Sequence, residues 1–178
     1  MKDKVPLYTI GHSTHLLEEF IEILQAHKIK HLVDVRSIPK SRRVPWFNIT
    51  SLPAHLEEEG IKYTHMPLLG GLRKTKKNSM NEGWENLSFR GFADYMQTDS
   101  FQKGLEELNA LLKPRKRLAI MCAEALPWRC HRSLISDAEL IRNIPVFHIM
   151  SKTKTYPHEL TAFALIDKKQ KPPTINYP

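Results

Sequence analysis

The sequence contains few cysteines and no long apolar run. Two of its 178 residues are cysteine, too few for the disulfide framework of a small secreted protein. No run approaches the roughly 20 apolar residues that span a bilayer, and the first ten residues, MKDKVPLYTI, lack the apolar segment of a signal peptide. We therefore expect a cytoplasmic protein without a membrane partner. Free thiols are expected, although both cysteines lie in one loop, where a local disulfide is possible.

Internal repeats and long linkers are also absent. With 178 residues and 41% hydrophobic content, the chain can bury a core without disulfide or metal staples. We expect a single domain over residues 1–178, with a core at about residues 7–166 and a polar tail at residues 167–178.

Short apolar segments alternate with helical patterns. Strands are expected near residues 7–10, 31–35, 61–66, 118–121 and 145–150, several of them apolar at every position, as in strands buried on both faces. Helical spacing predicts helices between them, including one at 89–112 with a break near 98–100, and a last helix from Pro157 through Ile166. The pattern predicts an α/β fold with a mostly parallel sheet of about five strands and helices on both faces.

Positive charge is concentrated in two loops. The formal net charge is +8, from 27 basic and 19 acidic residues. Eight basic residues, as many as the net charge, lie in two loops that contain no acidic residue: Arg36, Lys40, Arg42, Arg43, Arg73, Lys74, Lys76 and Lys77. Such a field attracts phosphates or polyanions, and nearby Trp46, Phe47 and Trp84 can stack bases. The alternative is that these are solvated loops and that the aromatic side chains cover the core.

Unusual residues follow four of the expected strands. They are His12 and Ser13, Asp34 and Arg36, Gly70 and Gly71, and Cys122 and Glu124. Because parallel strands end at one edge of a sheet, where ligands bind in open α/β folds, we expect a site there.

Three residues are candidates for catalysis. Glu124 is the first choice as general acid or base, and His12 is the second, although a surface histidine at a helix start is an equal alternative. Cys130 precedes an expected helix, whose N-terminus stabilises a thiolate. Cys122 ends an apolar strand and is interpreted as a small core residue.

Seven residues are candidates for substrate binding: Ser13, Arg36, Arg42, Gly70, Gly71, His131 and Arg132. Arg132, at a helix start, can hold a phosphate or carboxylate in a bidentate grip. A lone carboxylate at Asp34 is costly inside an apolar strand, and Arg36 lies two residues on, so these two are expected to pair. The alternative is that Arg132 and Glu124 only brace the loop.

Three known types of cysteine-containing site fit this sequence poorly. A phosphatase-type Cys-x5-Arg loop from Cys122 needs arginine where Trp128 stands, and a rhodanese-type loop needs glycines, which are absent between Cys122 and Cys130. Adjacent Cys130 and His131 cannot easily share one zinc ion, and no Cys-x2-Cys or His-x3-His pair occurs. We therefore predict no metal ligands, and the cofactor is left unassigned.

Several motifs together carry a resemblance: Tyr8–Ser13 (YTIGHS), Asp34–Ser37 (DVRS) with Pro39 and Arg42, Leu69–Gly71 (LGG), and Cys122–Glu124 (CAE) with Cys130–Arg132 (CHR). Over about residues 7–150 the chain resembles an uncharacterised family, domain of unknown function number four hundred and eighty-eight. The resemblance implies a small cytosolic α/β protein and implies no particular activity.

Three functional hypotheses remain. The first is an enzyme that acts on a phosphorylated or otherwise anionic, nucleotide-like substrate at the carboxyl edge of the sheet. The second is a nucleic-acid-binding module that uses the two basic loops. The third is a thiol-dependent or metal-dependent site at Cys122 and Cys130.

Overall fold

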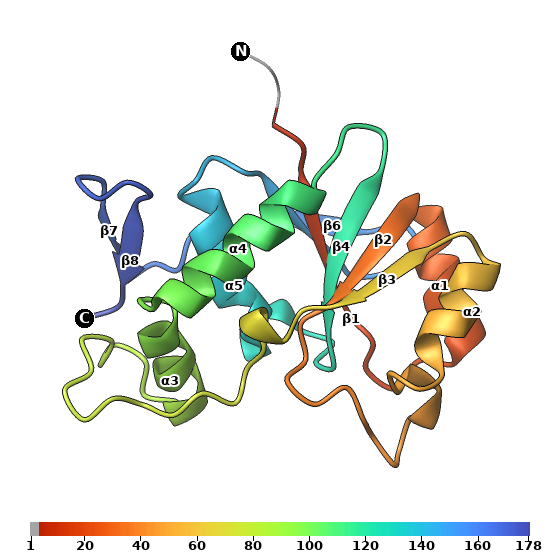
Figure 1. Cartoon of the computed structure of the whole chain (residues 1–178), viewed down its shortest axis with the longest axis horizontal. Coiled ribbons are helices and arrows are strands. Elements are labelled where there is room, and N and C mark those ends of the chain that lie inside the picture. Colours follow the sequence, from red (N-terminus) through yellow and green to blue (C-terminus); the bar gives the residue numbers. More distant parts are fainter. Residues whose placement is uncertain (1–3) are drawn as a thin grey trace.

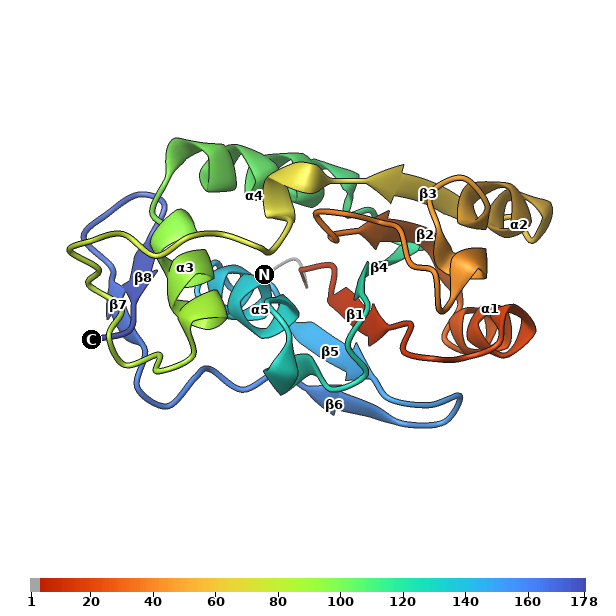
Figure 2. The ribbon, with the colours of Figure 1, turned by 90° about the horizontal axis from the view of Figure 1, so that it is seen from below.

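The centre of the fold, described for residues 4–178 by a computed structural model, is a six-stranded sheet. Its strand order is β3-β2-β4-β1-β5-β6 (Figure 2). Five strands are parallel: Leu7–Gly11 (β1), Ile29–Asp34 (β2), Lys62–His65 (β3), Arg117–Cys122 (β4) and Val146–Ile149 (β5). Thr155–Pro157 (β6) pairs antiparallel with β5 at the edge. The predicted α/β fold is confirmed, with one more strand in this sheet than expected.

Helices cover both faces of the sheet (Figure 1). Leu17–Ala26 (α1) and Leu52–Glu58 (α2) lie on one face. The other face carries Leu87–Tyr95 (α3), Asp99–Leu111 (α4) and Arg132–Leu140 (α5). No helix within residues 4–178 is long and apolar enough to cross a membrane.

Several strands are apolar at every position, without alternation of apolar and polar residues, because each face of the sheet packs against its own hydrophobic cluster. In β4, Leu118, Ile120 and Cys122 join the cluster under α3, α4 and α5, whereas Ala119 and Met121 join the cluster under α1 and α2. Side chains alternate between the two faces of a strand, so a strand buried on both faces needs an apolar residue at every position.

The predicted break between the third and fourth helices is confirmed. Asn86 caps α3 by accepting hydrogen bonds from the amides of Ser88 and Phe89. The Thr98 hydroxyl caps α4 by accepting from the Phe101 amide at 3.3 Å. Such caps satisfy amides that a helix start leaves without partners.

The expected helix from Pro157 to Ile166 is wrong. Pro157 ends β6, an edge strand, where a missing backbone N–H is tolerated. Leu165–Asp167 (β7) pairs with Thr174–Asn176 (β8) in a separate two-stranded sheet. Ile175 and Tyr177, in the segment that the sequence pattern leaves outside the core, are buried within it.

Proline opens three short 3-10 helices beyond the carboxyl ends of strands. These are Pro45–Phe47 (η1), Pro67–Leu69 (η2) and Pro127–Arg129 (η3), which follow β2, β3 and β4 respectively. Proline suits a first helical position because its fixed φ is already helical and its missing N–H needs no partner there. These turns shape the loops at the carboxyl edge of the sheet.

Candidate functional site

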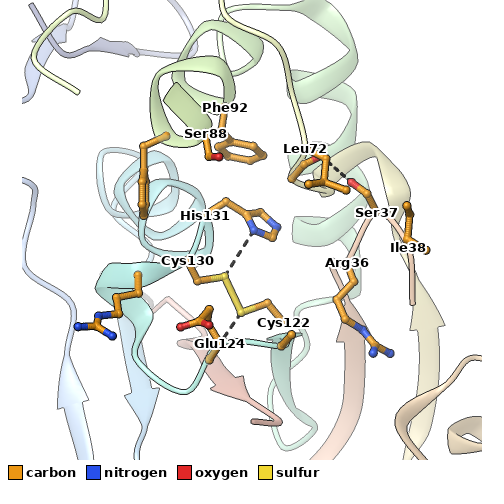
Figure 3. A pocket seen from close by; sticks show the side chains of 14 residues that line it. Arg36, Ser37, Ile38, Leu72, Ser88, Phe92, Cys122, Glu124, Cys130 and His131 are labelled. Carbon is orange, nitrogen blue, oxygen red and sulfur yellow. Dashed lines mark hydrogen bonds between the residues drawn. A yellow bond between two sulfur atoms is a disulfide. The ribbon is translucent and has the colours of Figure 1, made fainter. Parts of the chain in front are cut away.

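A cleft of about 300 Å³ opens at the carboxyl edge of the sheet (Figure 3). Cys122 and Cys130 lie on one side of this cysteine cleft, and Phe92 of α3 lies opposite them (Figure 3). Phe89 of the same helix also lines the cleft. Exposed Leu72, with Ile38, adds apolar surface to its lining. The cleft therefore offers an apolar lining beside two sulfur atoms.

A second, more polar depression adjoins the cysteine cleft. This basic hollow shares Arg36, Ile38, Ala123 and Glu124 with the cleft. Its further lining residues include His12, Ser13, Lys40, Ser41 and Arg43. A ligand that spans both would meet apolar surface at one end and exposed cations at the other.

Glu124 lies between the cysteine cleft and the basic hollow. Its side chain is exposed, and among residues 4–178 its carboxylate has no hydrogen-bond or ion-pair partner. The loop approaches β1 so closely that a Cβ on Gly11 would lie 1.7 Å from the Glu124 carbonyl oxygen. Glycine at position 11 therefore permits the backbone position that presents Glu124.

The predicted Asp34–Arg36 pair is confirmed. Asp34 is fully buried, and Arg36 donates from Nε to Oδ1 at 2.9 Å and from Nη2 to Oδ2 at 2.7 Å. Arg36 Nη2 also donates to the Phe47 carbonyl at 2.7 Å, and the Tyr63 hydroxyl donates to Asp34 Oδ2 at 2.5 Å. Burial and the Asp34 charge raise the pKa of Tyr63, which keeps its hydroxyl a donor.

His12 is tied to Arg36. Its Nε2 lies 3.2 Å from Arg36 Nη1, and its Nδ1 lies 2.8 Å from the Ser13 carbonyl oxygen. Because arginine only donates and a carbonyl only accepts, Nδ1 carries the proton. Burial lowers the pKa of His12 to about 4. At neutral pH His12 is therefore uncharged, and both of its ring nitrogens are occupied by the protein.

His131 presents a free ring nitrogen to the cysteine pair. Its Nε2 donates to the Val35 carbonyl at 2.8 Å, which leaves Nδ1 unprotonated at 3.5 Å from Cys130 Sγ. Burial lowers the pKa of His131 to about 4. A Cβ on Gly71 would lie 3.2 Å from this Nδ1, so glycine leaves room beside it.

Cys122 and Cys130 are joined as a disulfide (Figure 3). The expectation of free thiols is therefore corrected, and the alternative of a local disulfide holds. The loop 123–129 folds back over the strand end, so Cys130, two residues before α5, meets Cys122, the last residue of β4. Both cysteines are buried, with 2% and 7% of their surface exposed.

The buried side chain of Arg132 stabilises the loop 123–129. It is fully buried and donates to Thr9 Oγ1 at 3.0 Å and to the carbonyl oxygens of Glu124 at 2.7 Å and Ala125 at 3.3 Å. Burial lowers its pKa to about 9, so it remains charged at neutral pH. Its contacts hold the backbone on which Glu124 sits.

Seven of the ten predicted site residues line these two depressions. Arg36, Gly71, Glu124, Cys130 and His131 line the cysteine cleft, and His12 and Ser13 line the basic hollow. Arg42 is exposed on the neighbouring loop, and Gly70 and buried Arg132 line neither depression.

The apolar lining of the cleft was not predicted from the sequence. Phe89 and Phe92 belong to a helix whose three-residue spacing is that of an ordinary core-facing stripe. Ser88 and exposed Leu72 carry no local signal either. Within residues 4–178, no group of three or more His, Cys, Asp or Glu side chains is arranged to hold a metal ion.

Comparison with known proteins gives one match. No curated protein and no solved structure matches the chain. A family model described as Domain of unknown function DUF488 matches residues 16–139 of the 178. The match covers well over half of the chain and includes the strand ends and loops that form most of the site, so the protein belongs to the DUF488 family.

Proposed function

We propose that the protein is an enzyme that acts on a small anionic substrate, phosphorylated or nucleotide-like, bound across the cysteine cleft and the basic hollow. The observation that carries this proposal is the position of Glu124, whose carboxylate lines both depressions and has no partner among residues 4–178. A positioned carboxylate of this kind serves as general acid or base, which contributes roughly 100-fold to 10,000-fold to a rate.

Exposed cations support an anionic substrate. Lys40 and Arg43 line the basic hollow, and Arg129 lines the cysteine cleft. Arg36 lies between them, but Asp34 and the Phe47 carbonyl occupy its guanidinium. We therefore assign anion binding mainly to Lys40, Arg43 and Arg129, with Arg36 holding the strand ends in position.

Replacing Glu124 by Gln is expected to reduce turnover by at least about 100-fold, because the amide cannot transfer the proton. Folding should be unaffected, because the carboxylate has no partner within residues 4–178. Product formation from a panel of nucleotides and phosphate esters, followed by mass spectrometry, measures turnover, and thermal melting measures stability.

Glu85→Gln, at another exposed glutamate, serves as the matched control and should change neither quantity. If Glu124→Gln lowers the melting temperature and leaves turnover intact, Glu124 braces the loop and the proposal fails.

A second candidate function is nucleic-acid binding through the two basic loops. Both loops lie at the same end of the molecule, beyond the carboxyl ends of β2 and β3 (Figure 1). Six of their basic side chains are exposed: Lys40, Arg42, Arg43, Lys74, Lys76 and Lys77. The amide of Lys76 donates to buried Asp94 at 2.7 Å, so part of the second loop is anchored to α3. Fixed, exposed cations favour contact with a phosphate backbone.

Replacing Arg42, Arg43, Lys76 and Lys77 together by Ala is expected to abolish most retention on heparin and single-stranded DNA. Each change should alter the free energy of unfolding by no more than about 0.5 kcal/mol, because the side chains are exposed. Binding through several phosphates should weaken steeply with salt, with a slope of about −0.7 per contact. Unchanged retention, or the shallow slope of a single anion, would rule out this function.

A further inference from the structure

The two sulfur atoms are brought together by the framework around them. The amides of His12 and Ser13 donate to the carbonyls of Cys122 and Ala123, each at 2.9 Å. On the other side of the loop, Arg132 holds the carbonyls of Glu124 and Ala125. These contacts do not depend on the bond between the sulfurs, so the reduced thiols should remain neighbours.

The two cysteines differ in their surroundings. Cys130 precedes α5 and has the unprotonated Nδ1 of His131 at 3.5 Å from its Sγ. His131 is a weak base while the sulfurs are bonded, but a thiolate at Cys130 would stabilise the protonated ring beside it, so in the reduced protein this nitrogen can take the thiol proton. The positive end of the helix also favours the thiolate. Cys122 Sγ instead faces the Glu124 carbonyl oxygen at 3.7 Å, a contact that favours the protonated thiol. Cys130 is thus suited to be the nucleophile, with Cys122 as the thiol that resolves the intermediate.

The opening to these sulfurs carries mainly positive charge. Lys40, Arg43 and Arg129 are exposed along the two depressions and have no ion-pair partner within residues 4–178. In the part of the chain that the structure describes, Glu124 is the single carboxylate lining either depression. The field at the opening therefore favours an anionic reactant.

We propose that Cys122 and Cys130 form a redox pair that reduces an anionic low-molecular-weight disulfide bound in the cysteine cleft. This inference goes beyond the proposed function, because it assigns a second, thiol-based reaction to the same cleft and shares with that function only the anionic character of the ligand. The depression beside the sulfurs would hold the organic part of the disulfide, and the exposed cations would attract its carboxylates.

The chemistry is two successive thiol–disulfide exchanges. Once His131 has taken the Cys130 proton, the Cys130 thiolate attacks one sulfur of the disulfide RSSR. A mixed disulfide, Cys130–S–S–R, forms, and the leaving thiolate takes the proton back from His131 as RSH. The Cys122 thiol then loses its proton and attacks the Cys130 sulfur, which closes the Cys122–Cys130 disulfide and releases the second RSH. One disulfide gains two electrons and two protons, and the cysteine pair loses the same number.

Glutathione disulfide, which carries carboxylates, provides the test on the fully reduced protein. Reduced wild-type protein should form its internal disulfide and release two thiols, detected by mass spectrometry after alkylation. Cys122→Ser should accumulate glutathione at Cys130, because no thiol remains to resolve it. Cys130→Ser should react at least about tenfold more slowly, since Cys122 lacks the base and the helix end. Equal trapping in the two variants would overturn the assignment of roles.

His131→Gln separates the role of the base from a structural role. The glutamine amide can still donate to Val35, but it offers no basic nitrogen to Cys130. Exchange should slow by about tenfold at neutral pH, and the difference should shrink at about pH 9, where solvent deprotonates the thiol directly. A slowing that is the same at both pH values would show that His131 acts only through packing.

The charge preference is tested with Lys40→Ala/Arg43→Ala. This variant should lose rate severalfold toward glutathione disulfide and not toward cystamine, a cationic disulfide. An equal loss toward both would overturn the anionic assignment. If the reduced wild-type thiols react with neither disulfide until the protein is unfolded, the redox proposal fails. None of these measurements requires turnover by Glu124, so this failure is distinguishable from failure of the proposed function.

Discussion

Replacing Asp137 by Asn is expected to lower the free energy of unfolding by about 3–5 kcal/mol, because hydrogen bonds to a charged group contribute about 1.5–3 kcal/mol each and a buried donor left unsatisfied costs about 1–3 kcal/mol. Asp137 is fully buried in α5, and its carboxylate accepts four hydrogen bonds. The donors are His158 Nε2 at 2.7 Å, the Thr161 amide at 3.1 Å and hydroxyl at 2.7 Å, and the Tyr177 hydroxyl at 2.8 Å. An asparagine amide nitrogen cannot accept, so it would leave buried donors unsatisfied.

The effect of Asp137 extends along a chain of hydrogen bonds through the core. His158 Nδ1 lies 2.9 Å from His148 Nε2, and His148 Nδ1 lies 2.7 Å from Thr9 Oγ1, which accepts from Arg132. Because Arg132 only donates and the carboxylate only accepts, each group donates to the next. Burial lowers the pKa of His148 to about 3, consistent with a neutral ring that donates once and accepts once. Hydrogen bonds in such a chain strengthen one another, so the loss of Asp137 at one end should weaken the bonds along the whole chain.

Chemical denaturation measures this prediction, with Asp167→Asn as the control. Asp167 is exposed in β7, and within residues 4–178 its carboxylate accepts only from the Lys169 amide, so its replacement should change stability by no more than about 0.5 kcal/mol. Limited proteolysis of Asp137→Asn should cleave first near residues 158–161 and the C-terminus, which the carboxylate holds in place. A loss below about 1 kcal/mol would mean that the network is dispensable.

Replacing Arg36 by Met is expected to lower the free energy of unfolding by a similar amount, about 3–5 kcal/mol. The methionine side chain fills part of the space, but it leaves the buried Asp34 carboxylate without its guanidinium partner. It also removes the donors to the Phe47 carbonyl and to His12. The cost comes mainly from the uncompensated charge and not from the lost volume.

A double-mutant cycle tests that explanation. Asp34→Leu combined with Arg36→Met should cost less than the sum of the single changes, because the pair is then removed together. Arg42→Met, at an exposed arginine on the same loop, should change stability by no more than about 0.5 kcal/mol. If Arg36→Met behaves like Arg42→Met, the ion pair does not stabilise the loop.

The sheet, and the edge at which most of the candidate residues gather, could be predicted from local pattern. Strands that are apolar at every position, separated by helical stripes, indicate burial on both faces and parallel pairing. Parallel strands end at one edge, so the convergence of Glu124, Cys130 and Arg36 followed from the order of the elements. The Asp34–Arg36 pair was predictable because its partners are two residues apart on one strand face.

Other features depend on contacts between segments distant in the chain, and only the tertiary structure decided them. His131 reaches Val35, 96 residues away, and Tyr177 reaches Asp137, 40 residues away. The pattern of residues 157–166 suggested a helix, but partners in β5 and β8 made the segments at its two ends strands. Local periodicity reports which residues are buried, whereas the packing of crossover helices and the folded-back loop determines which of them meet. The sequence alone therefore determined the sheet and the edge at which the candidate residues gather. The pairing of Cys122 with Cys130, the free nitrogen of His131 and the Phe89–Phe92 side of the cleft arise from that packing.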